Sequence, residues 1–133
     1  LKSVIEQGIS KYQFVIVNNS PEDAQTQQLS DQAVVLEAGK NLGFGGGCNL
    51  GLNWVYEQNP EAIAWLINPD TVLPEDSLKN AIAFCANHPE LSIIGTTIHE
   101  PDGSIWFAGG EFDPGNGRIV ANTSPLEFAT DYV

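Results

Sequence analysis

The chain is poor in basic side chains. It has five Lys and Arg residues against 17 Asp and Glu, which gives a formal charge of −12 over 133 residues. Proteins that bind nucleic acids or anionic membrane surfaces use clustered Lys and Arg side chains, which take the place of the counterions around the phosphates. This composition therefore argues against both classes of protein. A phosphate ligand would have to be held by backbone N–H groups, by a helix N-terminus or through a bridging cation.

Cysteine, methionine and long apolar runs are also scarce or missing. Cys48 and Cys85 give neither a disulfide framework nor a metal-ligand spacing. We expect both cysteines to be buried and to pack as small hydrophobic side chains. No run approaches the roughly 20 apolar residues of a membrane span, so we expect no membrane insertion. The chain has no Met and begins in a helix-like pattern at residues 1–8. We therefore expect a segment of a longer cytoplasmic protein, which could act at the inner face of a membrane.

The hydrophobic pattern predicts alternating strands and helices up to Ile98. Short apolar runs rich in β-branched residues predict strands at 12–17, 33–36, 62–67 and 91–98. Helical spacing and turn residues predict helices over 21–29, from about 47 to 58, and from 74 to about 88. This alternation predicts an α/β fold with a doubly wound parallel sheet.

The pattern changes after residue 100. Pro101-Asp102-Gly103 predicts a hairpin turn, and glycine-rich turns separate further short strands, one of them at 118–121. We predict an antiparallel ribbon over residues 99–133, appended to an α/β part over residues 1–98. Together they would form a single domain.

Polar loops follow the first three predicted strands, at residues 18–20, 41–49 and 68–70. In open α/β sheets, ligands bind at the carboxyl ends of the strands, so these loops are the candidate site. The glycine-rich loop fits neither a P-loop nor a dinucleotide fingerprint in its spacing. On glycine content alone, a backbone cradle for a nucleotide and a plain turn both remain open.

Asp70 follows Pro69 directly after an apolar strand. One carboxylate can hold Mg²⁺ or Mn²⁺ when a diphosphate supplies further oxygens, but a plain turn explains the same residues. The amides of Asn18 and Asn19 could bind a base, and an Asx turn with Ser20 as helix cap explains them equally.

Taken together, the three segments resemble the family 2 glycosyltransferases of the GT-A fold, especially the rhamnosyltransferase-like branch. The matching stretches are VIVNNS at 15–20, NLGFGGGCNLG at 41–51 and LINPDT at 66–71. The resemblance implies a mostly parallel sheet flanked by helices, with an antiparallel ribbon at the C-terminal end. It also implies a nucleoside-diphosphate sugar donor, a divalent metal (Mg²⁺ or Mn²⁺), and transfer with inversion to a hydroxyl of a glycan acceptor.

The resemblance further implies roles for single residues. Asn18, where the family has Asp, would hold the base; Asn68 would face the ribose or diphosphate, and Asp70 the metal. The remaining lining of the nucleotide pocket would be Asn41, Gly43, Phe44 and Asn49. The family's first strand would precede Leu1 and its general base would follow Val133. The resemblance thus implies the donor-binding half of the enzyme, with no catalytic residue in this chain.

Alternatives to an active transferase remain open. A non-catalytic nucleotide-sugar-binding fragment, or a degenerate relative, is consistent with Asn at position 18. A sugar-phosphate nucleotidyltransferase shares the sheet topology, but its glycine loop would lie before Leu1. If the central strand slot is open, we expect pairing into a homodimer.

Overall fold

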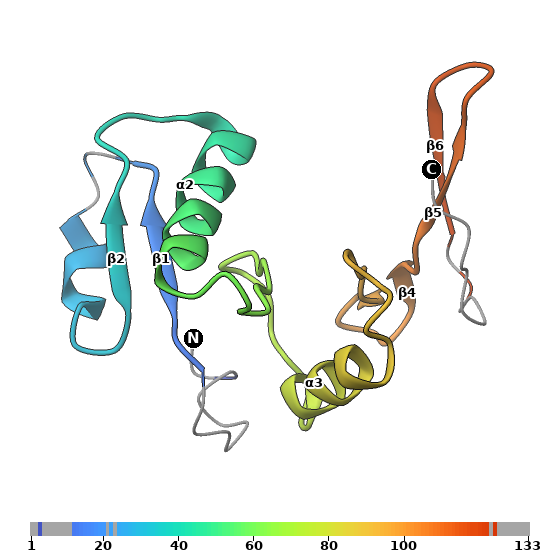
Figure 1. Ribbon diagram of the computed structural model, residues 1–133. Helices are drawn as coiled ribbons and strands as arrows, with labels where there is room; N and C mark the ends of the chain where they lie inside the picture. The colour runs from blue at the N-terminus through green and yellow to red at the C-terminus, as the bar shows by residue number, and fades with distance from the viewer. Residues whose placement is uncertain (1–2, 4–11, 21, 23, 123, 125–133) are drawn as a thin grey trace. The chain divides into compact units, whose positions relative to one another are not determined.

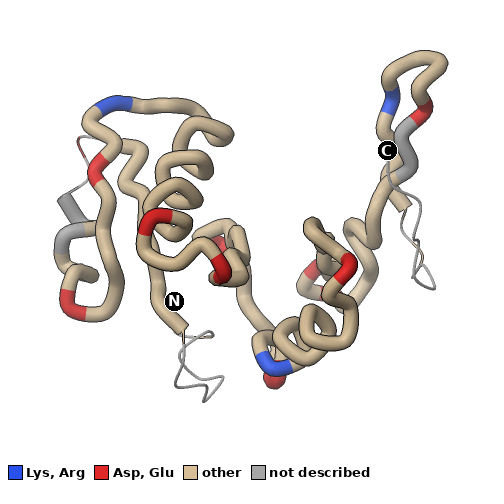
Figure 2. The backbone as a smooth tube through the Cα atoms, viewed as in Figure 1, with Lys and Arg blue, Asp and Glu red and all other residues tan. Residues whose placement is uncertain are grey.

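The computed structural model describes residues 3, 12–20, 22, 24–122 and 124. The helix expected at residues 1–8 lies, except for Ser3, outside the described residues. The chain divides into two compact units, Leu1–Ala83 and Phe84–Val133, and each is described by itself. Acidic side chains occur in both units and basic ones are sparse (Figure 2). Among the described residues, no helix combines the length and the apolar character needed to cross a membrane.

The first unit is built on two parallel strands, β1 (Val15–Asn18) and β2 (Val34–Glu37) (Figure 1). Both lie close to the predicted positions. Their register pairs the last residue of β1 with the last residue of β2, so the two strands end at the same level. The connection contains a 3₁₀ helix, η1 (Ala24–Leu29), where we predicted an α-helix. Six residues are too few for an α-helix to offset the cost of its first turn.

Helix α2 (Gly43–Gln58) lies against β1. A Cβ at Gly51 would lie 3.2 Å from Val17 Cγ2, and one at Gly47 would lie 3.4 Å from Asn19 Nδ2. These two glycines are four residues apart and therefore share one face of the helix. Because neither carries a side chain, the helix approaches the strand closely.

Two predicted strands do not form as expected. Residues 62–67 belong to no strand, and Ile63 is 69% exposed. In the run 91–98 only Ile98 enters a strand, and Ile93 is 85% exposed. An apolar run becomes a strand only when a neighbour supplies the ladder hydrogen bonds, and no described segment does so here. The prediction of a four-stranded parallel sheet is therefore wrong for the described residues, which hold one parallel pair.

Helix α3 (Ser77–Asn87) crosses the boundary between the two units. It begins after the predicted start at Pro74, whose carbonyl accepts a hydrogen bond of 2.8 Å from Ser77 Oγ. Asp76 precedes the helix with φ of 62°, a left-handed conformation that Asp tolerates better than most residues. Glu75 and Asp76 therefore lie just before the helix and not in its first turn.

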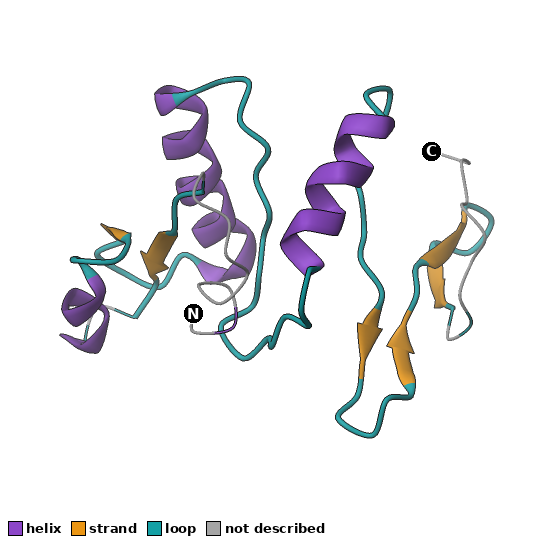
Figure 3. Ribbon diagram, turned by 90° about the horizontal axis from the view of Figure 1, so that it is seen from below, coloured by secondary structure: helices purple, strands orange, loops and turns teal. Residues whose placement is uncertain are grey.

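The second unit contains two antiparallel hairpins (Figure 3). The first pairs β3 (Ile98–His99) with β4 (Ile105–Phe107) across the predicted turn at Pro101-Asp102-Gly103. The second pairs β5 (Gly110–Asp113) with β6 (Arg118–Ala121). Antiparallel pairing therefore occurs where the ribbon was predicted, as two separate two-stranded pairs within residues 98–121.

Candidate functional site

The N-terminus of α2 lies at the carboxyl edge of the β1–β2 pair. In Figure 1 the connection from β2 crosses above the arrowheads of both strands before α2 begins. This is the edge at which parallel α/β sheets bind ligands. The structure therefore brings together two of the three predicted loops, the one after β1 and the glycine-rich one.

Asn19 joins these two loops through both ends of its side-chain amide. Its Nδ2 donates to the carbonyl of Gly43 at 3.0 Å, and its Oδ1 accepts from the N–H of Leu42 at 2.8 Å. The end of β1 is thereby fixed to the start of α2. Sequence reasoning did not assign this role, although an amide directly after a strand could have indicated it.

The start of α2 is also shaped locally by Asn41. Its Oδ1 accepts a hydrogen bond of 2.8 Å from the N–H of Gly43, which would otherwise lack a partner inside the helix. Gly43 has φ of 71°, a conformation that is strained for a side-chain-bearing residue. The glycines that we predicted as a loop therefore form the first turn of α2. The first-turn N–H groups and the helix dipole make this end suitable for an anion.

The surface over this first turn is open. The Phe44 side chain is 76% exposed, and Asn49, one turn further along, is exposed as well. A Cβ at Gly45 would meet no atom within 4 Å. Lys40, which sequence reasoning left without a role, is exposed in the connection just before the helix. A flat ring and a phosphate could both approach the backbone here.

Asn18 lies at the same edge but is turned into the protein. It is 5% exposed, its Nδ2 donates to Glu37 Oε2 at 2.9 Å, and its Oδ1 accepts from the N–H of Ser20 at 3.1 Å. The Asx turn with Ser20 is thus present. Both ends of the Asn18 amide already have partners within the chain. Glu37, which the sequence did not single out, presents an exposed carboxylate beside it.

Asn68 and Asp70 lie in a turn of their own. The Asn68 carbonyl accepts from the N–H of Thr71 at 3.0 Å, with Pro69 in the second position that favours it. Both side chains are exposed. Within the described ranges no group of three or more His, Cys, Asp or Glu could hold a metal ion by itself. A single exposed carboxylate fits an ion that takes one or two protein oxygens and completes its shell with phosphates and water.

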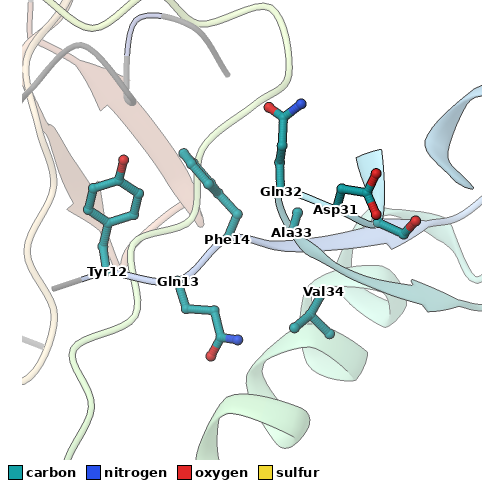
Figure 4. A pocket seen from close by; sticks show the side chains of 8 residues that line it. Tyr12, Gln13, Phe14, Asp31, Gln32, Ala33 and Val34 are labelled. Carbon is teal, nitrogen blue, oxygen red and sulfur yellow. The ribbon is translucent and has the colours of Figure 1, made fainter. Parts of the chain in front are cut away.

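A shallow hollow of about 310 Å³ lies at the amino ends of β1 and β2, at the edge opposite the predicted site (Figure 4). Tyr12 and Phe14 point to one side of the chain and Gln13 to the other, as an extended segment requires. The Tyr12 and Phe14 rings meet edge to face with centroids 5.2 Å apart. We assign this hollow no ligand.

Comparison with protein families matches residues 1–124 to Glycosyl transferase family 2. Comparisons with curated proteins and with solved structures found no match. The family match spans every residue predicted for the site, the whole first unit, and the second unit as far as residue 124. Membership of this family implies a GT-A-like α/β fold and the use of nucleotide-sugar donors. The parallel pair, with a helix N-terminus at its carboxyl edge, agrees with such a fold. The chain belongs to glycosyl transferase family 2.

Proposed function

We propose that the chain binds the donor in a transferase that moves a sugar from a nucleoside diphosphate to a hydroxyl of a glycan, with inversion and with a divalent metal. The observation that carries this proposal is the α2 N-terminus. Asn19 holds it at the carboxyl edge of the parallel pair and Asn41 accepts from its Gly43 N–H, in a chain that belongs to this family. The rhamnosyltransferase-like branch remains part of the proposal, because the motifs at 41–51 and 66–71 suggest it.

The diphosphate would lie over the first turn of α2. With a net charge of −12, the chain as a whole repels an anion, so binding depends on local positive potential. The first-turn N–H groups supply part of it, and the exposed Lys40 supplies a cation within the same connection. Phe44 and Asn49 would line the pocket, the first as a flat apolar surface and the second as a hydrogen-bonding amide.

Asp70 would hold the metal ion, with Asn68 toward the ribose or the diphosphate. The ion, when bound, neutralises the charge that develops on the leaving diphosphate. One exposed carboxylate is enough protein ligation for Mg²⁺ or Mn²⁺ when diphosphate oxygens complete the shell. In transfer with inversion the acceptor hydroxyl attacks the anomeric carbon as the diphosphate leaves, and a carboxylate removes the proton. We assign that carboxylate to no residue of this chain.

The metal role is tested by calorimetric titration of UDP, dTDP and GDP, each with and without Mn²⁺. We expect Mn²⁺ to strengthen binding of the preferred nucleotide, and Asp70→Asn to remove that gain. Glu57→Gln is the matched control, since it removes one exposed carboxylate near the other end of α2. Metal-independent binding that is unaffected by Asp70→Asn would show that the metal role is wrong.

A further inference from the structure

The last residues of β1 and β2, Asn18 and Glu37, are register partners joined by a side-chain hydrogen bond. Asn18 Nδ2 donates to Glu37 Oε2 at 2.9 Å. Asn18 is buried and its Oδ1 accepts from the Ser20 N–H, so both ends of its amide are hydrogen-bonded within the protein. Glu37, by contrast, is exposed. The acceptor that this edge offers to solvent is therefore the carboxylate and not the amide.

The two sides of this edge carry different groups. Val17 and Asn19 face α2, as their closeness to Gly51 and Gly47 shows. Side chains alternate along a strand, so Asn18 points away from α2, and its partner Glu37 lies beside it. A ligand that crosses the edge would thus meet backbone N–H groups on one side and a carboxylate on the other.

We propose that Glu37 accepts a hydrogen bond from the nucleoside of the donor, from its base N–H or its ribose hydroxyls. This inference rests on the proposed function, because it places a nucleotide across the edge with its diphosphate at the α2 N-terminus. An ionised carboxylate only accepts, and a nucleoside offers N–H and O–H donors to match it. The bond from Asn18 occupies Oε2 and orients the group, which leaves acceptor capacity at Oε1.

Electrostatics and hydrogen bonding predict opposite effects of neutralising Glu37. If the carboxylate makes no contact with the ligand, its removal weakens repulsion of a diphosphate and binding should become tighter. If it accepts from the nucleoside, its removal should weaken binding about tenfold or more, because hydrogen bonds to charged groups are among the stronger ones. The direction of the change therefore distinguishes a ligand contact from a purely structural pair.

The experiment compares Glu37→Gln with Glu57→Gln in calorimetric titrations of UDP, dTDP and GDP with Mg²⁺. Both variants remove one exposed carboxylate from the first unit. We expect Glu37→Gln to weaken the preferred nucleotide about tenfold or more and Glu57→Gln to leave it unchanged. Affinity for Glu37→Gln equal to or tighter than wild type would overturn the inference while leaving nucleotide binding intact. Absence of binding by the wild-type chain to all three nucleotides would overturn the proposed function, and this inference with it.

Further arms of the experiment identify the donor group and check the fold. Glutamine still offers an oxygen to Asn18 Nδ2, so far-UV circular dichroism should be unchanged for Glu37→Gln. Glu37→Asp, which is shorter by one carbon, should weaken binding in the same direction, and wild-type affinity in both variants would overturn the inference. Deoxy analogues of the preferred nucleotide, each lacking one sugar hydroxyl, and its N-methylated-base analogue distinguish a sugar hydroxyl from a base N–H as the group that donates to Glu37. The analogue that lacks the contacted donor should bind wild type and Glu37→Gln about equally.

Discussion

The sharpest structural prediction concerns the Asn19 amide. Replacing Asn19 with Ala removes the donor to the Gly43 carbonyl, at 3.0 Å, and the acceptor of the Leu42 N–H, at 2.8 Å. These bonds connect positions 23 and 24 residues apart, so they fix the start of α2 to the end of β1. We expect the first turn of α2 to open more often in the variant while the rest of the helix persists.

The magnitude follows from the two lost bonds. A hydrogen bond of this kind contributes about 1 kcal/mol net, so losing both costs about 2 kcal/mol, or roughly a 30-fold increase in the opening equilibrium. Asn19→Asp keeps an acceptor for the Leu42 N–H and places a negative charge near the helix N-terminus. Its other carboxylate oxygen cannot donate to the Gly43 carbonyl, so it should recover no more than about half of the loss.

Amide hydrogen exchange followed by NMR measures this opening directly. The Leu42 amide should exchange roughly 30-fold faster in Asn19→Ala, while the amides near the end of α2 keep their wild-type rates. Asn53→Ala, an exposed asparagine of the same helix, is the control and should leave the Leu42 rate unchanged. Wild-type exchange at Leu42 in the Asn19→Ala variant would refute the reasoning.

Two further predictions concern the glycines of α2 and the first hairpin. A Cβ at Gly46 would lie 2.8 Å from Leu42 Cβ, so Gly46→Ala should destabilise the first unit by about 1–3 kcal/mol. A Cβ at Gly45 would meet no atom within 4 Å, so Gly45→Ala should stabilise the first unit by about 0.5–1 kcal/mol. Urea unfolding measures both variants, and a Gly46→Ala variant more stable than Gly45→Ala would contradict this. In the hairpin, hydrogen bonds from the Ser104 hydroxyl at 2.6 Å and the Ser104 N–H at 2.9 Å lower the pKa of Asp102. Their contribution to stability is present above the ordinary carboxyl pKa and is lost as pH falls through the lowered one. Ser104→Ala should raise the Asp102 pKa in an NMR titration, and an unchanged value would count against these bonds.

Local sequence was enough to place the elements whose partners lie nearby. The strands β1 and β2 and both hairpins were predicted because turn residues and β-branched runs mark them directly. The run at 62–67 is apolar throughout, yet it forms no strand, because strand formation depends on a neighbour that supplies hydrogen bonds. Composition reports the capacity of a segment to pair and carries no information on whether a partner is present.

The candidate site was predictable in position but not in its contacts. Glycines have low helix propensity, so the pattern placed the start of α2 at about residue 47. The actual start at Gly43 depends on the Asn41 and Asn19 side chains, which satisfy backbone groups there. Asn19 hydrogen-bonds to backbone atoms, and Glu37 accepts a hydrogen bond from Asn18, 19 positions earlier in the chain. Neither contact has a sequence signature. The predicted roles of Asn68 and Asp70 stay predictions.

The central claim, that a nucleotide sits over the α2 N-terminus with its metal at Asp70, is tested most directly by NMR. Resonances are followed as the preferred nucleotide diphosphate is added, first with Mg²⁺ and then with Mn²⁺ in its place. The account predicts shifts of the amides from Leu42 to Gly47, and paramagnetic broadening by Mn²⁺ that is strongest around Asp70. Shifts confined to the hollow at Tyr12 and Phe14, or broadening that leaves the Asp70 turn unaffected, would contradict it.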